Sequence, residues 1–151
     1  MGEISLIQAL EEYKTVYMPA RNLATRTREE YANDLTAFIS FLDKAGITKA
    51  GDISIVQVDR YLARLDELGY SGSTRKRKAI TFRSFLAFLY RSRYISQDIS
   101  RQVILPFEEH SVPRILTQAE YQKLLQACSQ NPRDFAIITL LLQTGIRLSE
   151  L

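Results

Sequence analysis

The chain has 151 residues and a formal net charge of +3, with 46% apolar and 25% charged residues, which is the composition of an ordinary folded protein. This length accommodates one domain with a good core, or one small domain and a piece of another. The single cysteine, Cys128, excludes a disulfide framework, and with only one histidine a site built from His and Cys ligands is not expected. The N-terminus carries Glu3 and lacks a basic start, so it is not a signal peptide, and a reducing cytoplasm fits.

Two helices are expected in the first part of the chain. The first opens at Ser5, because Ser5 and Gln8 have the spacing of a capping box, and Pro19 closes that segment. The second is expected to start at Thr27, with Glu30 completing another capping box. Its apolar stripe repeats at helical spacing and consists of Tyr31, Leu35, Phe38 and Leu42.

Two more helices follow, and the second of them has two different faces. Ser54 and Gln57 predict the start of a third helix, which Gly69 ends, and a fourth is expected from near Ser73 to about Arg93. One face of the fourth helix is apolar, with Ala79, Phe82, Phe85, Leu86 and Leu89. The opposite face carries four cations among small residues and no acid, namely Lys76, Arg77, Arg83 and Arg91. Such a face can lie along a phosphate backbone or in a major groove.

Positive charge is concentrated around this fourth helix. Residues 71–103 hold eight cations and one acid, a local charge of +7 in a chain whose net charge is +3. This concentration points to a polyanion, either nucleic acid or an acidic membrane surface, while a solvated basic face is the alternative. Arg26 and Arg28 at the start of the second helix are expected to join the DNA-contacting set, since helix N-termini also favour phosphate.

The expected domain organisation is a helical bundle at 1–98, a linker at 99–115 and a second part at 116–151. In the second part, a capping box at Thr117 and Glu120 starts one helix, and Asn131 followed by Pro132 starts another. This last helix is apolar nearly all round from 136 to 142 and stops at Gly145. We expect such a helix to be buried in a larger domain, so the chain is expected to stop just inside that domain.

These patterns together resemble the tyrosine recombinases, the site-specific recombinases of phage-integrase type. Two stretches carry the likeness of the first part, Thr27-x3-Tyr31-x3-Leu35-x2-Phe38 and Gly69-x3-Ser73-Thr74-x2-Arg77, which runs into Phe82-x2-Phe85. Three stretches carry it in the second part, beginning with Pro113-Arg114-Ile115-Leu116-Thr117-x2-Glu120 and Arg133-Asp134-x-Ala136-Ile137-Ile138. The most specific stretch is Thr144-Gly145-Ile146-Arg147-Leu148-Ser149-Glu150-Leu151. The resemblance implies an all-α chain: a four-helix, SAM-like core-binding bundle, a linker, and the first two helices of a truncated catalytic domain.

The resemblance also implies roles for two residues near the C-terminus. Arg147 matches the first of two catalytic arginines that hold the scissile phosphate, and Glu150 matches an acidic position expected to orient that arginine. A guanidinium fork stabilises the charge that develops on the phosphate oxygens better than an ammonium would. Neither a metal nor another cofactor is expected, since the family conserves energy in a 3′-phosphotyrosyl linkage.

The other catalytic groups of the family are expected beyond Arg147. They are a lysine, a His-x-x-Arg element, a further His or Trp, and the nucleophilic tyrosine. All eight tyrosines of this chain precede Arg147, so this polypeptide alone is not expected to cleave or join DNA. Because the first helix opens near Ser5, a simple, Xer-like or transposon-type recombinase without an arm-binding domain is expected.

The expected partner is duplex DNA at a recombination site, bound sequence-specifically. Self-association with other protomers, as a tetramer, is expected for the full-length parent, and neither a membrane nor a small-molecule substrate is expected. A cytoplasmic, nucleoid-associated protein of prokaryotic, phage or mobile-element origin fits this reading. Two alternatives stay open: a non-catalytic helical DNA-binding regulator, and a helical protein-interaction module with a basic face.

Overall fold

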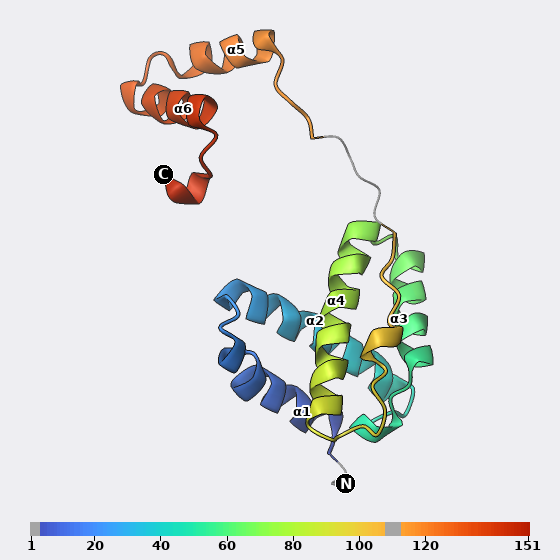
Figure 1. Cartoon of the computed structure of the whole chain (residues 1–151). Helices are drawn as coiled ribbons and strands as arrows, with labels where there is room; N and C mark the ends of the chain where they lie inside the picture. The colour runs from blue at the N-terminus through green and yellow to red at the C-terminus, as the bar shows by residue number, and fades with distance from the viewer. Residues whose placement is uncertain (1–3, 108–112) are drawn as a thin grey trace. The chain divides into compact units, whose positions relative to one another are not determined.

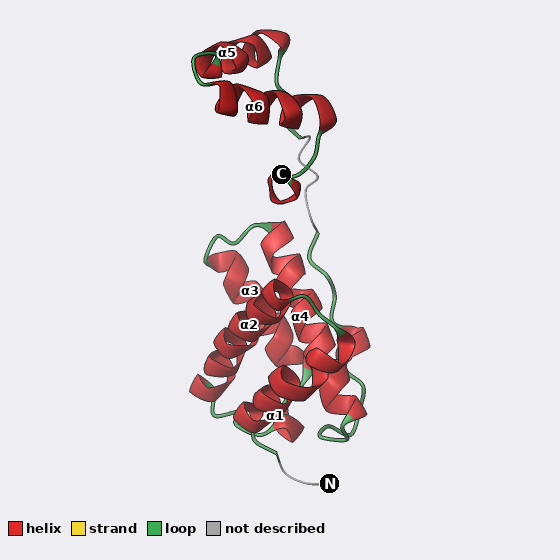
Figure 2. Cartoon of the chain, turned by 90° about the vertical axis from the view of Figure 1, so that its left-hand side faces the viewer, coloured by secondary structure: helices red, strands yellow, loops and turns green. Residues whose placement is uncertain are grey.

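The computed structural model describes residues 4–107 and 113–151, and the regular elements of these residues are helices (Figures 1 and 2). The chain divides into two compact units, residues 1–109 and 110–151. We describe each unit by itself. None of the helices in the described ranges is long and apolar enough to cross a membrane.

Residues 4–107, the described part of the first unit, form four α-helices, with short helical turns between them and after the last. The α-helices are α1 (Leu6–Glu12), α2 (Thr25–Lys44), α3 (Ile55–Glu67) and α4 (Gly72–Arg91). The short turns are η1 (Tyr13–Tyr17), η2 (Pro19–Arg21), η3 (Ala50–Asp52) and η4 (Ser100–Gln102). Helix α4 packs against both α2 and α3, and α1 packs against α2 (Figure 1). The all-α fold class predicted from the sequence is therefore confirmed.

Capping chemistry sets the starts of α1 and α3 as predicted. At α1, the backbone N–H of Ser5 donates to Gln8 Oε1 and that of Gln8 donates to Ser5 Oγ, both at 3.2 Å. At α3, Ser54 and Gln57 form the same reciprocal pair. Each pair satisfies two backbone donors that a helix N-terminus leaves without partners.

The predicted start of the second helix is wrong by two residues. Helix α2 begins at Thr25 with Ala24 as its N-cap, and no side chain caps it, so the capping box expected at Thr27 is not formed. Instead, Nε of Arg28 donates to the Leu23 carbonyl at 2.6 Å and folds this side chain back over the turn. This bond satisfies a carbonyl that precedes the helix, and the backbone N–H groups of the first turn have no side-chain cap.

The fourth helix also begins slightly earlier and ends earlier than predicted. Its N-cap is Ser71, whose Oγ accepts from the backbone N–H of Thr74 at 3.3 Å. It ends at Arg91, because Arg93 adopts a left-handed backbone with φ of 60° and its N–H donates to the Tyr90 carbonyl at 3.0 Å. A non-glycine residue in this conformation is uncommon.

Aromatic rings fill the core between these helices. Phe38 of α2, Tyr61 of α3 and Phe82 of α4 have ring centroids 4.7–5.5 Å apart. A second group joins Tyr13 of η1 to Phe85 of α4, with centroids 5.3 Å apart in an edge-on arrangement. The predicted apolar faces of α2, α3 and α4 therefore meet as expected, and their burial is the main force that holds the bundle together.

The core continues past residue 98, where the sequence analysis placed the start of a linker. Ile99, Ser100 and Val103 are buried, and η4 packs against α4. Nη2 of Arg83 donates to the Val103 carbonyl at 2.6 Å. Residues 99–103 thus belong to the first unit and are not linker.

The second unit contains α5 (Gln118–Cys128), α6 (Pro132–Thr144) and the short turn η5 (Leu148–Glu150). The predicted starts are confirmed, since Thr117 and Glu120 form a capping box and Asn131 Oδ1 accepts from two backbone N–H groups of α6. Gly145 ends α6 in the left-handed conformation, with φ of 65°. We expected α6 to be buried in a domain core. No residue of α5 or α6 is fully buried, so the described residues of this unit do not supply that core.

Candidate nucleic-acid interface

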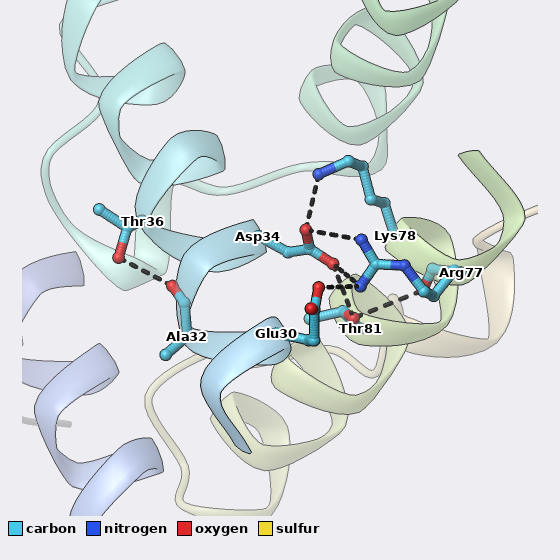
Figure 3. Close-up of polar contacts among 7 residues, drawn as sticks. All are labelled: Glu30, Ala32, Asp34, Thr36, Arg77, Lys78 and Thr81. Atoms are coloured by element: carbon cyan, nitrogen blue, oxygen red, sulfur yellow. Dashed lines mark hydrogen bonds and ion pairs between the residues drawn. The ribbon is translucent and has the colours of Figure 1, made fainter. Parts of the chain in front are cut away.

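A carboxylate of α2 ties the basic half of α4 to the bundle (Figure 3). Asp34 is only 3% exposed, and Nη1 and Nη2 of Arg77 donate to its two oxygens at 2.8 and 3.2 Å. Nζ of Lys78 donates to Asp34 Oδ1 at 2.6 Å, and the Thr81 hydroxyl lies 3.4 Å from Oδ2. All three partners come from little more than one turn of α4. The carboxylate therefore has partners for nearly all of its accepting capacity.

Separating the partners of this buried network would cost much free energy. A buried charge without a partner is costly, and breaking a buried pair by removing one partner costs about 3–5 kcal/mol. The planar fork of Arg77 matches both oxygens of the carboxylate, which adds geometric specificity to the attraction. Asp34 thus fixes α4 against α2 at one register.

Arg77 has a second acidic neighbour, Glu30, which lies on α2 like Asp34. Oε2 of Glu30, one helical turn before Asp34, lies 3.4 Å from Arg77 Nη1. The Arg77 and Glu30 side chains are 42% and 47% exposed, so this second contact lies at the solvent edge of the network. With Asp34 and Lys78 included, the four groups carry two positive and two negative charges. The predicted DNA-contacting residue Arg77 is therefore accessible but already paired.

Two other residues of the predicted set are engaged with the backbone. Arg83 donates to the Val103 carbonyl, and its Nε is buried without a hydrogen-bond partner among the described residues. Arg28 donates to the Leu23 carbonyl. Each guanidinium group secures a neighbouring segment of chain, which is a role that the helical periodicity alone did not indicate.

The other three predicted residues lie in different surroundings. Arg26 in the first turn of α2 and Arg91 in the last turn of α4 are exposed, while Lys76 is half-buried and engaged in a contact. Besides Lys78, two more cations of residues 71–103 that lie outside the predicted set are ion-paired: Arg75 with Asp66 at 2.9 Å and Arg101 with Asp98 at 3.4 Å. The positive charge read from residues 71–103 is thus partly offset by acids, some from other helices.

The tyrosines of the bundle serve packing. Tyr13 is fully buried and donates its hydroxyl hydrogen to Ser84 Oγ at 2.8 Å. Burial raises the pKa of Tyr13 to about 12, because the phenolate would lose its hydration. A hydrogen bond to Glu12 raises the pKa of Tyr94 as well. Both shifts favour the neutral phenol, the opposite of what a nucleophilic tyrosine requires.

The second unit presents Arg147 beside an acid. The Arg147 side chain is 82% exposed, and its Nη1 lies 3.2 Å from Glu150 Oε1. The backbone N–H of Arg147 donates to the other carboxylate oxygen of Glu150 at 2.8 Å. The carboxylate therefore holds the residue at both its main chain and its side chain. The exposed guanidinium retains donors for an anion.

Comparison with known proteins places these observations in a family. The sequence profile described as "Phage integrase, N-terminal SAM-like domain" matches residues 10–93. A protein named tyrosine recombinase XerC from Oceanobacillus iheyensis is 34% identical over 155 residues, covering 99% of this chain and 50% of that protein. Another named tyrosine recombinase XerC, from Roseiflexus sp. (strain RS-1), is 32% identical over 136 residues, covering 87% of this chain and 44% of that protein. The chain thus spans about half the length of these relatives.

A solved structure shares the fold. The crystal structure of a lambda integrase dimer bound to a COC′ core site has a TM-score of 0.69 and 18% sequence identity, covering 87% of this chain and 36% of that one. At this identity the likeness concerns the fold alone, and it agrees with the SAM-like bundle expected from the sequence.

The sequence analysis missed Asp34, the centre of the network. A signal was present, since Asp34 directly precedes Leu35 and lies one turn before Phe38, on the buried side of the predicted stripe. An acid in that place requires cations from a neighbouring helix. Arg77 was assigned to the DNA-contacting face of the helix, and its pairing could have been considered by asking which residues neutralise Asp34.

Proposed function

Because this chain belongs to the phage-integrase family of tyrosine recombinases and carries its N-terminal SAM-like domain, we propose that its first unit binds duplex DNA sequence-specifically at a recombination site. The single observation that carries this proposal is the family match over α1 to α4. The fold neighbour lambda integrase is described as bound to its core site, which supports the same partner here. The two curated relatives come from bacteria, which supports action on the DNA of a bacterial cell.

In this proposal the phosphate contacts come from the first turn of α2, from the first half of α4 and from the last turn of α4. Arg26, Lys76, Arg77 and Arg91 supply them, with the N-terminus of α2 adding its partial positive charge. Arg28 and Arg83 have further N–H donors beyond those given to the backbone, so they contribute to a smaller extent. Contacts to phosphate position the protein, and small side chains on α4 permit close approach to base edges.

For the second unit we propose the phosphate-holding part of a catalytic site. Arg147 holds the scissile phosphate through its exposed guanidinium, and Glu150 orients it by the two contacts described above. In the complete recombinase a tyrosine outside this chain attacks that phosphate to form a 3′-phosphotyrosyl intermediate, and protomers assemble as a tetramer. This chain alone does not cleave DNA.

The DNA-binding proposal is tested by the salt dependence of binding to a labelled duplex. If about four phosphates are neutralised, the dissociation constant rises about a hundredfold between about 50 and 200 mM salt. A change of less than about twofold contradicts phosphate contact and favours a protein-interaction module with a basic face.

The catalytic proposal is tested in a complete recombinase that carries this chain. Arg147→Ala is expected to abolish the covalent protein–DNA complex while DNA binding is retained. Loss of both means that Arg147 is mainly structural. Absence of a covalent complex in the unmodified complete protein favours a non-catalytic DNA-binding regulator.

A further inference from the structure

We propose that Glu30 limits the DNA affinity of the bundle by pairing with the partly exposed Arg77 guanidinium, where a phosphate would otherwise bind. This inference rests on the proposed function of DNA binding. It adds an acidic residue that determines how strongly Arg77 attracts DNA of any sequence.

The geometry of Arg77 supports this assignment. Nη1 and Nη2 of its guanidinium both donate to the buried Asp34, which fixes the plane of the group. Glu30 lies beside the same Nη1, at 3.4 Å, and the Arg77 side chain is 42% exposed (Figure 3). A phosphate that approaches Arg77 from solvent therefore meets a carboxylate already in place.

The two acids beside Arg77 have different roles because their burial differs. The Asp34 side chain is 4% exposed and also neutralises Lys78, so it is part of the bundle's structure. The Glu30 side chain is 47% exposed and Arg77 is its recorded ion-pair partner, so it can be displaced. An exposed pair of this kind contributes little to stability, which makes Glu30 a competitor for Arg77 at low structural cost.

The experiment compares two substitutions that remove the same charge from α2. Glu30→Gln removes the competitor, and Glu29→Gln removes an exposed acid one residue away, which the helix turns to a different direction. Each is titrated with one duplex of about 30 base pairs at several salt concentrations. Both variants lose one negative charge from the same part of α2, so the long-range effect of that charge on DNA affinity is matched, and a difference in affinity reports the contact with Arg77.

We expect Glu30→Gln to bind about two- to fivefold more tightly than Glu29→Gln at low salt. Its slope of log affinity against log salt is expected to be steeper by less than about 0.9, the value for one whole phosphate contact, because Arg77 then makes in full a contact that Glu30 otherwise weakens. In an Arg77→Gln background, Glu30→Gln is expected to bring no gain. If that background unfolds, Arg77→Lys, which keeps the charge and loses the fork, takes its place, and the gain is expected to shrink.

The outcomes separate this inference from the function on which it rests. Equal affinity and slope for the two glutamine variants overturn the inference, while salt-dependent binding by the unmodified chain leaves the proposed function standing. Weaker binding by Glu30→Gln also overturns it, since Glu30 would then orient Arg77 toward DNA. Salt-independent binding by the unmodified chain overturns both.

Discussion

The buried carboxylate of Asp34 makes a stability prediction that follows directly from its contacts. In Asp34→Asn the side chain keeps its shape but loses its charge, and one accepting oxygen becomes an amide that donates hydrogen bonds. That amide faces the donors of Arg77 and Lys78, and the Lys78 side chain is only 12% exposed. The ammonium group is left poorly solvated and without a countercharge.

The expected loss is about 3–5 kcal/mol of unfolding free energy, the cost of removing one partner from a buried ion pair. Small proteins are stable by only about 5–15 kcal/mol in total, so this loss is large. For a unit of this size, a loss of 3 kcal/mol lowers Tm by about 12–24 °C.

Thermal and urea unfolding followed by circular dichroism measures this loss. Asp59→Asn, which alters an exposed acid on α3, is the matched control and is expected to change stability by less than about 0.5 kcal/mol. A loss below about 1 kcal/mol for Asp34→Asn would refute the reasoning, because Asp34 would then not anchor α4.

Two further predictions concern the tyrosine and the left-handed arginine of the bundle. Burial raises the pKa of Tyr13 from 10.0 to about 12 in the folded protein. The contribution of Tyr13 to the unfolding free energy is therefore fully present below pH 10. It is lost as the pH rises to 12, because the unfolded chain releases the Tyr13 proton first. The loss of unfolding free energy amounts to roughly 2–3 kcal/mol. Tyr13→Phe should reduce this alkaline loss in unfolding experiments at pH 9 to about 12. An unchanged pH profile would rule Tyr13 out as the source of the loss. Arg93→Gly should raise the unfolding free energy by about 0.5–1 kcal/mol, because glycine adopts a φ of 60° without strain. Arg91→Gly, at the last residue of α4, should lower it by about 0.5 kcal/mol, and the same sign for both variants would contradict the role of the backbone angle.

The sequence predicted what local chemistry decides. The caps at Ser5, Ser54 and Thr117 were confirmed because a capping box needs only residues three positions apart. The apolar faces predicted for α2 and α4 were confirmed because helical periodicity assigns each residue to a side. Gly145 was confirmed as the end of α6 because glycine adopts the left-handed conformation freely.

The sequence did not predict what depends on contacts across the fold. Arg77 lies 43 positions from Asp34, and periodicity places it on a face without naming what covers that face. Arg83 was assigned to the same open face, but residues 99–103 return across α4 and accept its hydrogen bond at Val103. Local spacing can mark Asp34 as a buried acid that needs cations, but it does not say which distant residues supply them, so the pairing required the structure.

The central claim is that the bundle holds DNA through positive charge on α2 and α4, and Arg26 tests it most directly. Arg26→Glu reverses an exposed charge in the first turn of α2, where an acid favours the helix, so the fold is kept. Lys123→Glu, on α5 of the other unit, is the matched reversal. In duplex titrations across a range of salt, we expect Arg26→Glu to weaken binding about tenfold and flatten the salt slope by about 0.9 relative to Lys123→Glu. Equal affinity and equal slope for the two variants would contradict the claim.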